Sequence, residues 1–186
     1  MRVLALSGSL RESSYNTRLL RAAAELAPDG IEVALYPPKR LGAIPPYDAD
    51  LENEGTPEAV TELKRAIADA DAVLVATPEY NWSIPGQLKN VLDWVSRPIA
   101  ESPLRGKPAL VIGASTSAYG AVWSQAELRK VLGILGSRTV EAEIAVAHAQ
   151  DRFDESGRLV DEEIRAQLTE AVRDLVAAAV APAVAA

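Results

Sequence analysis

The chain has 186 residues, of which 48% are hydrophobic and 24% are charged, a balance typical of a soluble globular protein. It contains no cysteine and one histidine, so disulfides, thiolate nucleophiles, iron–sulfur clusters and multi-histidine sites are excluded, and no metal site is expected. The net charge of −7 argues against a broad basic surface for nucleic acid or for an anionic membrane. The longest apolar run, residues 175–186, is far shorter than the ~20 residues of a membrane span, so we expect a cytoplasmic protein.

Five short runs of aliphatic residues are predicted to be β-strands. Most of them are continuously apolar instead of alternating, which is typical of strands covered on both faces of a sheet. In chain order the runs are Arg2–Ser7, Ile31–Tyr36, Ala72–Thr77, Pro108–Ala114 and Thr139–Val146.

Helical patterns fill the intervals between these runs. Apolar residues recur there every three or four positions, which gives each helix one buried stripe. Residues 37–55, with their four prolines, are instead predicted to be one long loop. The helical stripes are Leu19, Ala23 and Leu26; Val60, Leu63 and Ile67; Leu88, Val91, Leu92 and Val95; Leu128, Val131, Leu132 and Leu135; and Ile164, Leu168, Val172 and Leu175 in a last helix over 161–180.

This alternation predicts an α/β fold with a doubly wound, five-stranded parallel sheet and helices on both faces. We expect a single domain over residues 1–186, whose Ala/Val-rich tail from residue 177 is either a frayed end or an interface. Ligands of such sheets bind at the carboxyl ends of the strands. Functional residues are therefore expected in the loops after Ser7, Tyr36, Thr77 and Ala114.

The loop after the first strand is suited to a phosphate group. It leads into a helix, whose free N-terminal amides and dipole attract anions. Ser9, Ser14, Asn16 and Thr17 offer polar side chains there, and Arg11 offers a bidentate cation. Serine and asparagine also cap helices for purely local reasons, which is the alternative interpretation. The loop matches neither G-x-x-x-x-G-K-S/T nor G-x-G-x-x-G, so a phosphate bound here favours a mononucleotide cofactor.

The loop after the third strand brings aromatic side chains into a chain that has few of them. Residues 77–90 read TPEYNWSIPGQLKN, in which two prolines restrict the backbone while Tyr80 and Trp82 offer aromatic surface. Such a loop can present main-chain groups to the edge of a flat heterocycle and an apolar wall to its face. The alternative is a stiff turn whose aromatic rings seal the end of the sheet.

These two loops together resemble a known family. The patterns S-G-S-L-R-x-x-S-x-N at Ser7–Asn16 and P-E-Y-N-x-S-x-P-G-x-L-K-N-x-L-D-W at Pro78–Trp94 closely resemble the NADPH-dependent FMN reductase family, including its chromate and quinone reductases. The likeness extends to Leu104–Pro108. It implies a flavodoxin-like fold, non-covalently bound FMN, and a homodimer or homotetramer with the flavin near a subunit interface.

The resemblance also implies which residues bind FMN. One group is expected to hold the phosphate, a second to line the isoalloxazine and ribityl region, with Glu79 acting through its backbone, and a third to close the other side of the ring. The groups are Ser9, Arg11, Ser14, Asn16 and Thr17; Pro78, Glu79, Tyr80, Asn81 and Trp82; and Ser115, Thr116 and Ser117. In the third loop many relatives have more glycine.

An FMN-dependent NAD(P)H oxidoreductase is the function that the resemblance implies. Hydride would pass from NADPH or NADH through flavin N5 to a quinone, a flavin, an azo compound or a metal oxyanion such as chromate, with no catalytic side chain. The motifs leave open both the acceptor and the choice between NADPH and NADH. Lys39, Arg40 and Arg105 are candidate ligands of the NADPH 2′-phosphate.

Two other functional classes and one surface feature complete the predictions. A flavodoxin-type electron carrier would bind FMN without NAD(P)H activity of its own, and the acidic charge suits it, although the threonine-rich flavodoxin loop is missing. A serine hydrolase would combine Ser9 or Ser115 with His148, but there is no G-x-S-x-G elbow.

Trp82 and Trp94 are predicted to contribute to a surface between subunits.

Overall fold

The computed structural model describes residues 1–181 and is built around one parallel β-sheet. Its strands are β1 (Arg2–Ser7), β2 (Glu32–Leu35), β3 (Ala72–Ala76), β4 (Pro108–Ala114), β5 (Arg138–Thr139) and β6 (Ile144–Val146). The order across the sheet is β2-β1-β3-β4-β5, and β6 also pairs with β4. All these pairings are parallel, and the chain changes direction across the sheet between β1 and β3. The predicted doubly wound sheet is thereby confirmed.

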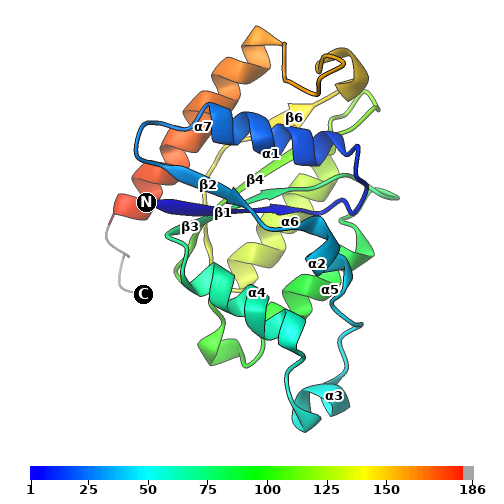
Figure 1. Ribbon diagram of the computed structural model, residues 1–186, viewed down its shortest axis with the longest axis vertical. Helices are drawn as coiled ribbons and strands as arrows, with labels where there is room; N and C mark the ends of the chain where they lie inside the picture. The colour runs from blue at the N-terminus through cyan, green and yellow to red at the C-terminus, as the bar shows by residue number, and fades with distance from the viewer. Residues whose placement is uncertain (182–186) are drawn as a thin grey trace.

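Helices cover both faces of the sheet (Figure 1). On one face lie α1 (Tyr15–Glu25) and α7 (Glu162–Val180), and on the other lie α4 (Glu58–Ala68), α5 (Gly86–Val95) and α6 (Val122–Ile134). Alternate residues of β1 enter the two cores, since Leu4 and Leu6 pack on the α4 side and Val3 and Ala5 on the α1 side. Burial on both faces explains why the strand sequences are continuously apolar.

The predicted last strand, Thr139–Val146, is divided in two. Ala109 of β4 pairs with Thr139, whereas Ile112 pairs with Ile144, so the edge chain advances two residues more than β4 over the same distance. The extra residues leave the ladder between β5 and β6. An edge strand tolerates such an excursion because it has no neighbour on its outer side.

The predicted loop over residues 37–55 contains two short helices, α2 (Pro38–Gly42) and α3 (Ala49–Glu54). Proline at the first position of α2 and an Asp48 side chain that accepts a hydrogen bond from the Asp50 amide are ordinary helix starts, which the proline-rich composition obscured. The 3₁₀ turns Ile99–Glu101 and Ala149–Asp151 complete the elements.

Trp94 joins this segment to the core and does not form an exposed surface. Its side chain is completely buried, its indole Nε1 donates to the Pro45 carbonyl at 2.8 Å, and its ring packs edge-on against Tyr47. The prediction that Trp94 contributes to a surface between subunits is therefore wrong. Of the predicted tail, residues 177–180 form the last turn of α7, and residues 182–186 lie outside the described part of the chain.

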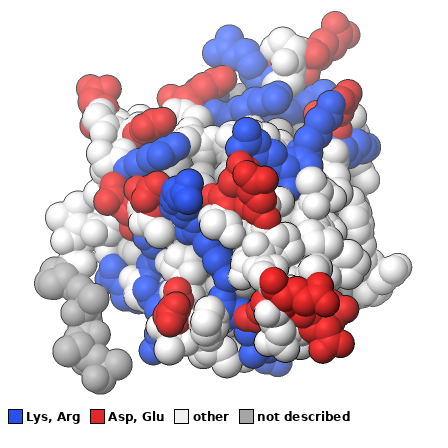
Figure 2. All heavy atoms as spheres, turned by 60° about the horizontal axis from the view of Figure 1, so that its bottom comes forward, with Lys and Arg blue, Asp and Glu red and all other residues white. Residues whose placement is uncertain are grey.

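Charges of both signs interleave on the molecular face that Figure 2 shows, and this face carries no broad basic surface. Within residues 1–181, no helix combines the length and apolar character needed to cross a membrane.

Gly113 allows β4 and α6 to approach closely near the carboxyl edge of the sheet. A Cβ atom at this position would lie 2.9 Å from Nε2 of Gln125 and 3.0 Å from the carbonyl oxygen of Thr77. The Gln125 side chain is completely buried, so it has little room to move away.

We therefore expect Gly113→Ala to lower the free energy of unfolding by about 1–3 kcal/mol through overpacking. Gly133→Ala is the matched control, because a Cβ there meets no atom within 4 Å and the residue is exposed in α6. This control should stabilise the protein by about 0.5–1 kcal/mol through helix propensity. Urea titrations followed by circular dichroism measure both, and an equal effect of the two variants would contradict the close approach.

Candidate functional site

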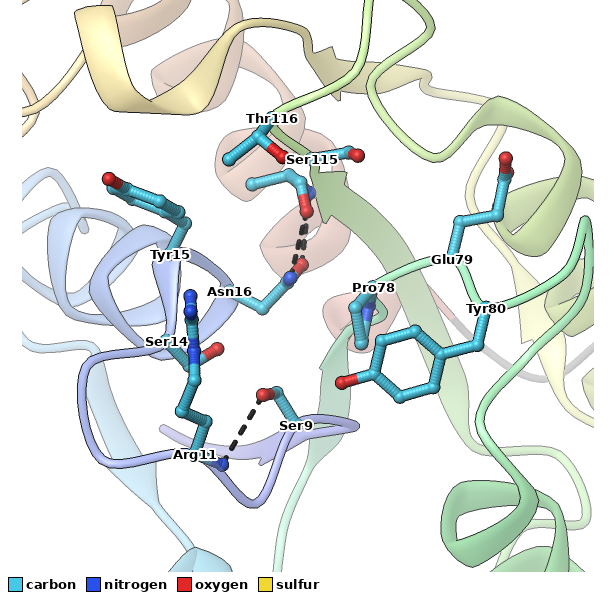
Figure 3. A pocket seen from close by; sticks show the side chains of 11 residues that line it. Ser9, Arg11, Ser14, Tyr15, Asn16, Pro78, Glu79, Tyr80, Ser115 and Thr116 are labelled. Carbon is cyan, nitrogen blue, oxygen red and sulfur yellow. Dashed lines mark hydrogen bonds between the residues drawn. The ribbon is translucent and has the colours of Figure 1, made fainter.

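A cleft of about 260 Å³ opens at the carboxyl ends of β1, β3 and β4 (Figure 3). It lies where the strand order reverses, which is the usual ligand position in such sheets. Three loops far apart in sequence build it, and they are three of the four loops singled out from the sequence, the loop after Tyr36 being the exception. The lining residues are Ser9, Arg11, Ser14, Tyr15, Asn16, Pro78, Glu79, Tyr80, Ala114, Ser115 and Thr116.

The first wall of the cleft is the N-terminus of α1. Ser14 caps this helix, and its Oγ accepts a hydrogen bond from the Thr17 amide at 3.4 Å. The Tyr15 and Asn16 amides precede the first intrahelical donors, and no acidic residue stands in the first turn to compete for them. Ser9 and Arg11 face the same space in Figure 3. This wall therefore combines amide donors, hydroxyl groups and one guanidinium.

Asn16 lines the cleft, but its side chain has a structural task. Its Nδ2 donates to the Ala114 carbonyl and its Oδ1 accepts from the Ala114 amide, both at 2.9 Å. Strand β3 ends at Ala76, so Ala114 has no backbone partner from β3 at this level. The amide group of Asn16 turns one N–H and its carbonyl oxygen toward Ala114, as a peptide unit would, and supplies the missing pair of hydrogen bonds.

Thr17 does not line the cleft, although it belongs to the predicted phosphate-binding set. Its side chain points beneath the loop, where its Oγ1 lies 2.9 Å from Oγ of Ser7 and the residue is 3% exposed. Thr17 is the third residue of α1, and the turn of the helix directs it toward the sheet.

The second wall is a tight hairpin. Tyr80 and Ser83 exchange backbone hydrogen bonds of 3.0 and 3.2 Å, and both residues between them have positive φ, 52° for Asn81 and 66° for Trp82. Two successive left-handed residues form the turn that suits a two-residue hairpin, but they are unfavourable for a bulky tryptophan. The turn carries Asn81 and Trp82 away from the cleft, so neither predicted residue lines it.

Trp82 instead belongs to an exposed aromatic cluster beside the cleft. Its ring centre lies 4.2 Å from that of Trp123, which in turn lies 4.8 Å from that of Tyr119. Trp82 and Tyr119 are 63% and 56% exposed, so the cluster presents apolar surface to solvent next to Tyr80. Such surface on loops commonly serves recognition.

Two glutamates clamp the hairpin to α6. The Glu79 carboxylate accepts hydrogen bonds from the Trp123 and Ser124 amides, both at 3.1 Å, and so caps a helix whose own N-cap residue, Ala121, has no capping side chain. In the other direction, Glu127 of α6 accepts from Oγ of Ser83 at 2.6 Å. One oxygen of the Glu79 carboxylate is thus engaged by the N-terminus of α6.

The third wall contains Ser115 and Thr116, while Ser117 stands outside the cleft. Oγ of Ser115 donates to Oγ of Ser117 at 3.1 Å. The Ser117 carbonyl accepts from the His148 amide, but within residues 1–181 no hydrogen bond joins the His148 imidazole to either Ser9 or Ser115. A serine–histidine hydrolase arrangement is absent from this region.

Comparison with known proteins decides the family. The family model for NADPH-dependent FMN reductase matches residues 1–151. The chain belongs to this family. An NAD(P)H-dependent FMN reductase of Pseudomonas aeruginosa is 42% identical over 89% of this chain and 88% of its own length. A 2-hydroxy-1,4-benzoquinone reductase of a Burkholderia species is 38% identical over 90% of both chains.

A solved structure agrees with this assignment. FerB, a flavoenzyme NAD(P)H:(acceptor) oxidoreductase of Paracoccus denitrificans, superimposes with a TM-score of 0.86 at 35% identity over 96% of each chain. The predictions of the FMN reductase family, of a reductase that uses FMN and NAD(P)H, and of the flavodoxin-like fold are confirmed.

Two residues that line the cleft, Tyr15 and Ala114, were not among the individual residues predicted to bind FMN. Tyr15 carried a signal, because it is an aromatic residue between Ser14 and Asn16 of the recognised motif. Its ring lies 5.6 Å from that of Phe153 and below the guanidinium of Arg18 at 5.2 Å. Ala114 contributes through its position at the end of β4, and its residue type gives no signal.

We expect Asn16→Ala to lower the free energy of unfolding by about 2–5 kcal/mol, because the Ala114 amide and carbonyl each lose a buried partner. The matched control is Asn53→Ala, an exposed asparagine in α3, which should change stability by less than about 0.5 kcal/mol. Urea denaturation measures both variants. A loss for Asn16→Ala no larger than that of the control would contradict the bridging role.

Proposed function

We propose that this protein binds FMN in the cleft and uses it to carry electrons from NAD(P)H to quinones and related small acceptors. The observation that carries the proposal is the union of a phosphate-suited helix N-terminus and a rigid, partly aromatic hairpin in one cleft of this family's fold. Bound FMN supplies the chemistry, accepting hydride and delivering electrons to the acceptor. The protein supplies binding, orientation and access.

The cleft residues fit the chemistry of FMN. A phosphate monoester accepts several hydrogen bonds from one side, which the amides of Tyr15 and Asn16, the hydroxyl of Ser9 and the guanidinium of Arg11 would donate. Backbone groups of residues 78–80 and 115–116 would meet the flavin and its ribityl chain, with Tyr80 and Pro78 as apolar contacts. The cleft volume of about 260 Å³ is small for a complete flavin, which supports a ring that extends beyond it and stays accessible.

No side chain of the cleft is proposed as an acid or a base. The only carboxylate of the lining, that of Glu79, already accepts two hydrogen bonds from α6. The protein would act through position and through the backbone donors that surround the flavin.

Quinones are the first acceptors that we propose, because two of the compared relatives carry the names of quinone or acceptor reductases. Free flavins, azo compounds and chromate are proposed as further acceptors, since an accessible ring imposes little selection on the oxidant. The exposed cluster of Trp82, Tyr119 and Trp123 supports a homodimer or homotetramer. We further propose that residues 1–186 act as one domain in the cytoplasm.

The phosphate contact gives the first test. Arg11→Gln should weaken FMN binding by about 10- to 100-fold, because a charge-assisted hydrogen bond contributes about 1.5–3 kcal/mol. Riboflavin has the same ring system without phosphate, so its affinity should change little. Fluorescence titration of the flavin-free protein measures both dissociation constants.

Arg173→Gln is the control for this experiment, because Arg173 is an exposed cation on α7 and lies in none of the clefts described. Equal weakening of FMN and riboflavin by Arg11→Gln would contradict a phosphate contact. Failure of the unaltered protein to bind FMN would overturn the proposed function.

The reductase itself is tested by rapid mixing of the FMN-loaded protein with NADPH or NADH without oxygen. The absorbance of oxidised flavin should disappear within the time of one turnover and return when 1,4-benzoquinone is added. A steady-state panel of benzoquinone, free FMN, an azo dye and chromate then ranks the acceptors. Flavin that binds but is not bleached by either nucleotide would indicate an electron carrier instead.

A further inference from the structure

A second cleft lies on the other side of the loop that forms the first wall. Its volume is about 280 Å³, and Arg11 lines both clefts. The segment from Ser9 to Ser14 is thus a thin partition with a cavity on each side. The second cleft is lined by Leu10, Arg11, Glu12, Thr17, Arg21, Leu35, Pro37, Pro38 and Lys39.

The lining combines an apolar floor with a cationic rim. Leu10, Leu35, Pro37 and Pro38 offer aliphatic surface, and Leu10 is 46% exposed. A free inorganic anion needs no such floor, and an uncharged hydrophobic molecule needs no such rim. The combination suits a ligand that joins a flat ring to phosphate groups.

The rim has an excess of positive charge in a protein whose net charge is −7. Within residues 1–181, Arg11 and Arg21 form no salt bridge. Lys39 lies 3.2 Å from Glu12, but both side chains are 86% exposed, so water screens this pair. Cations without a fixed partner are available to an anionic ligand.

We propose that the second cleft binds the adenosine 2′-phosphate half of NADPH and so makes the protein prefer NADPH over NADH. This inference rests on the proposed function, in which the nicotinamide half reaches the flavin of the first cleft. The adenine would lie on Leu10 and Pro38, while Arg21 and Lys39 would receive the 2′-phosphate. Arg11, which lines both clefts, would neutralise part of the negative charge of the phosphate groups bound in them.

The sequence suggested three cations as ligands of the NADPH 2′-phosphate, and the structure places them in three different sites. Lys39 lines the second cleft. Arg40 lines a different groove and pairs with Glu62 at 3.2 Å. Arg105 precedes β4 and therefore lies at the amino ends of the parallel strands, whereas the first cleft lies at their carboxyl ends. Arg21, which sequence reasoning did not select, takes the place of the last two.

Arg21→Gln and Lys39→Gln test the proposal, with Arg173→Gln as the matched control on α7. Each test variant should raise the KM for NADPH relative to that for NADH by about tenfold, as expected for one charge-assisted contact. Neither should alter kcat or the FMN content. The control should leave the ratio of the two KM values unchanged.

Calorimetry provides a readout that is independent of the reaction. Adenosine 2′,5′-bisphosphate should bind the FMN-loaded protein more tightly than adenosine 5′-monophosphate does, and Arg21→Gln should reduce this difference by about tenfold, leaving the contribution of Lys39. Equal binding of the two probes, or an equal rise of both KM values, would overturn the cleft assignment. Flavin that neither nucleotide reduces would instead refute the proposed function, even if the bisphosphate binds as expected.

Discussion

Between the ends of β1 and β4 lies a gap that β3 does not fill, and the side-chain amide of Asn16 bridges it with two hydrogen bonds of 2.9 Å to Ala114. The two residues are 98 positions apart in the chain. This interaction sets the separation between the loop that begins α1 and the loop that follows β4. Because those loops form two walls of the cleft, this one buried amide links the walls directly.

The remaining wall is positioned by a different means. Glu79 binds the N-terminus of α6, and Glu127 of α6 binds back to Ser83. The hairpin between these contacts holds a tryptophan in a left-handed conformation, which is unfavourable unless the surroundings maintain it. The two carboxylates and the packing of Trp82 on Trp123 provide that support. At the carboxyl end of the sheet, where ligands bind, side-chain hydrogen bonds and ring packing thus hold this wall in place.

The sequence was sufficient for the sheet, for the family and for the loops that meet at the cleft, because continuous apolar runs and long motifs report directly on burial and on family. It was insufficient for the direction of individual side chains. Thr17 and Trp82 belong to the same motifs as Ser14 and Tyr80, yet helical turn and hairpin twist point them elsewhere. The interrupted edge strand escaped prediction because β5 and β6 are separated by a change of register that apolar character alone does not record.

The three tryptophans occupy two contrasting environments, which makes the protein's own light emission informative. Trp94 is completely enclosed beside Tyr47, so its emission responds when the core opens to water. Trp82 and Trp123 are in contact with each other and with water at the border of the cleft, where an absorbing ring system would quench them. The chain therefore carries a buried tryptophan, Trp94, that reports on the core and an exposed pair, Trp82 and Trp123, that reports on the border of the cleft.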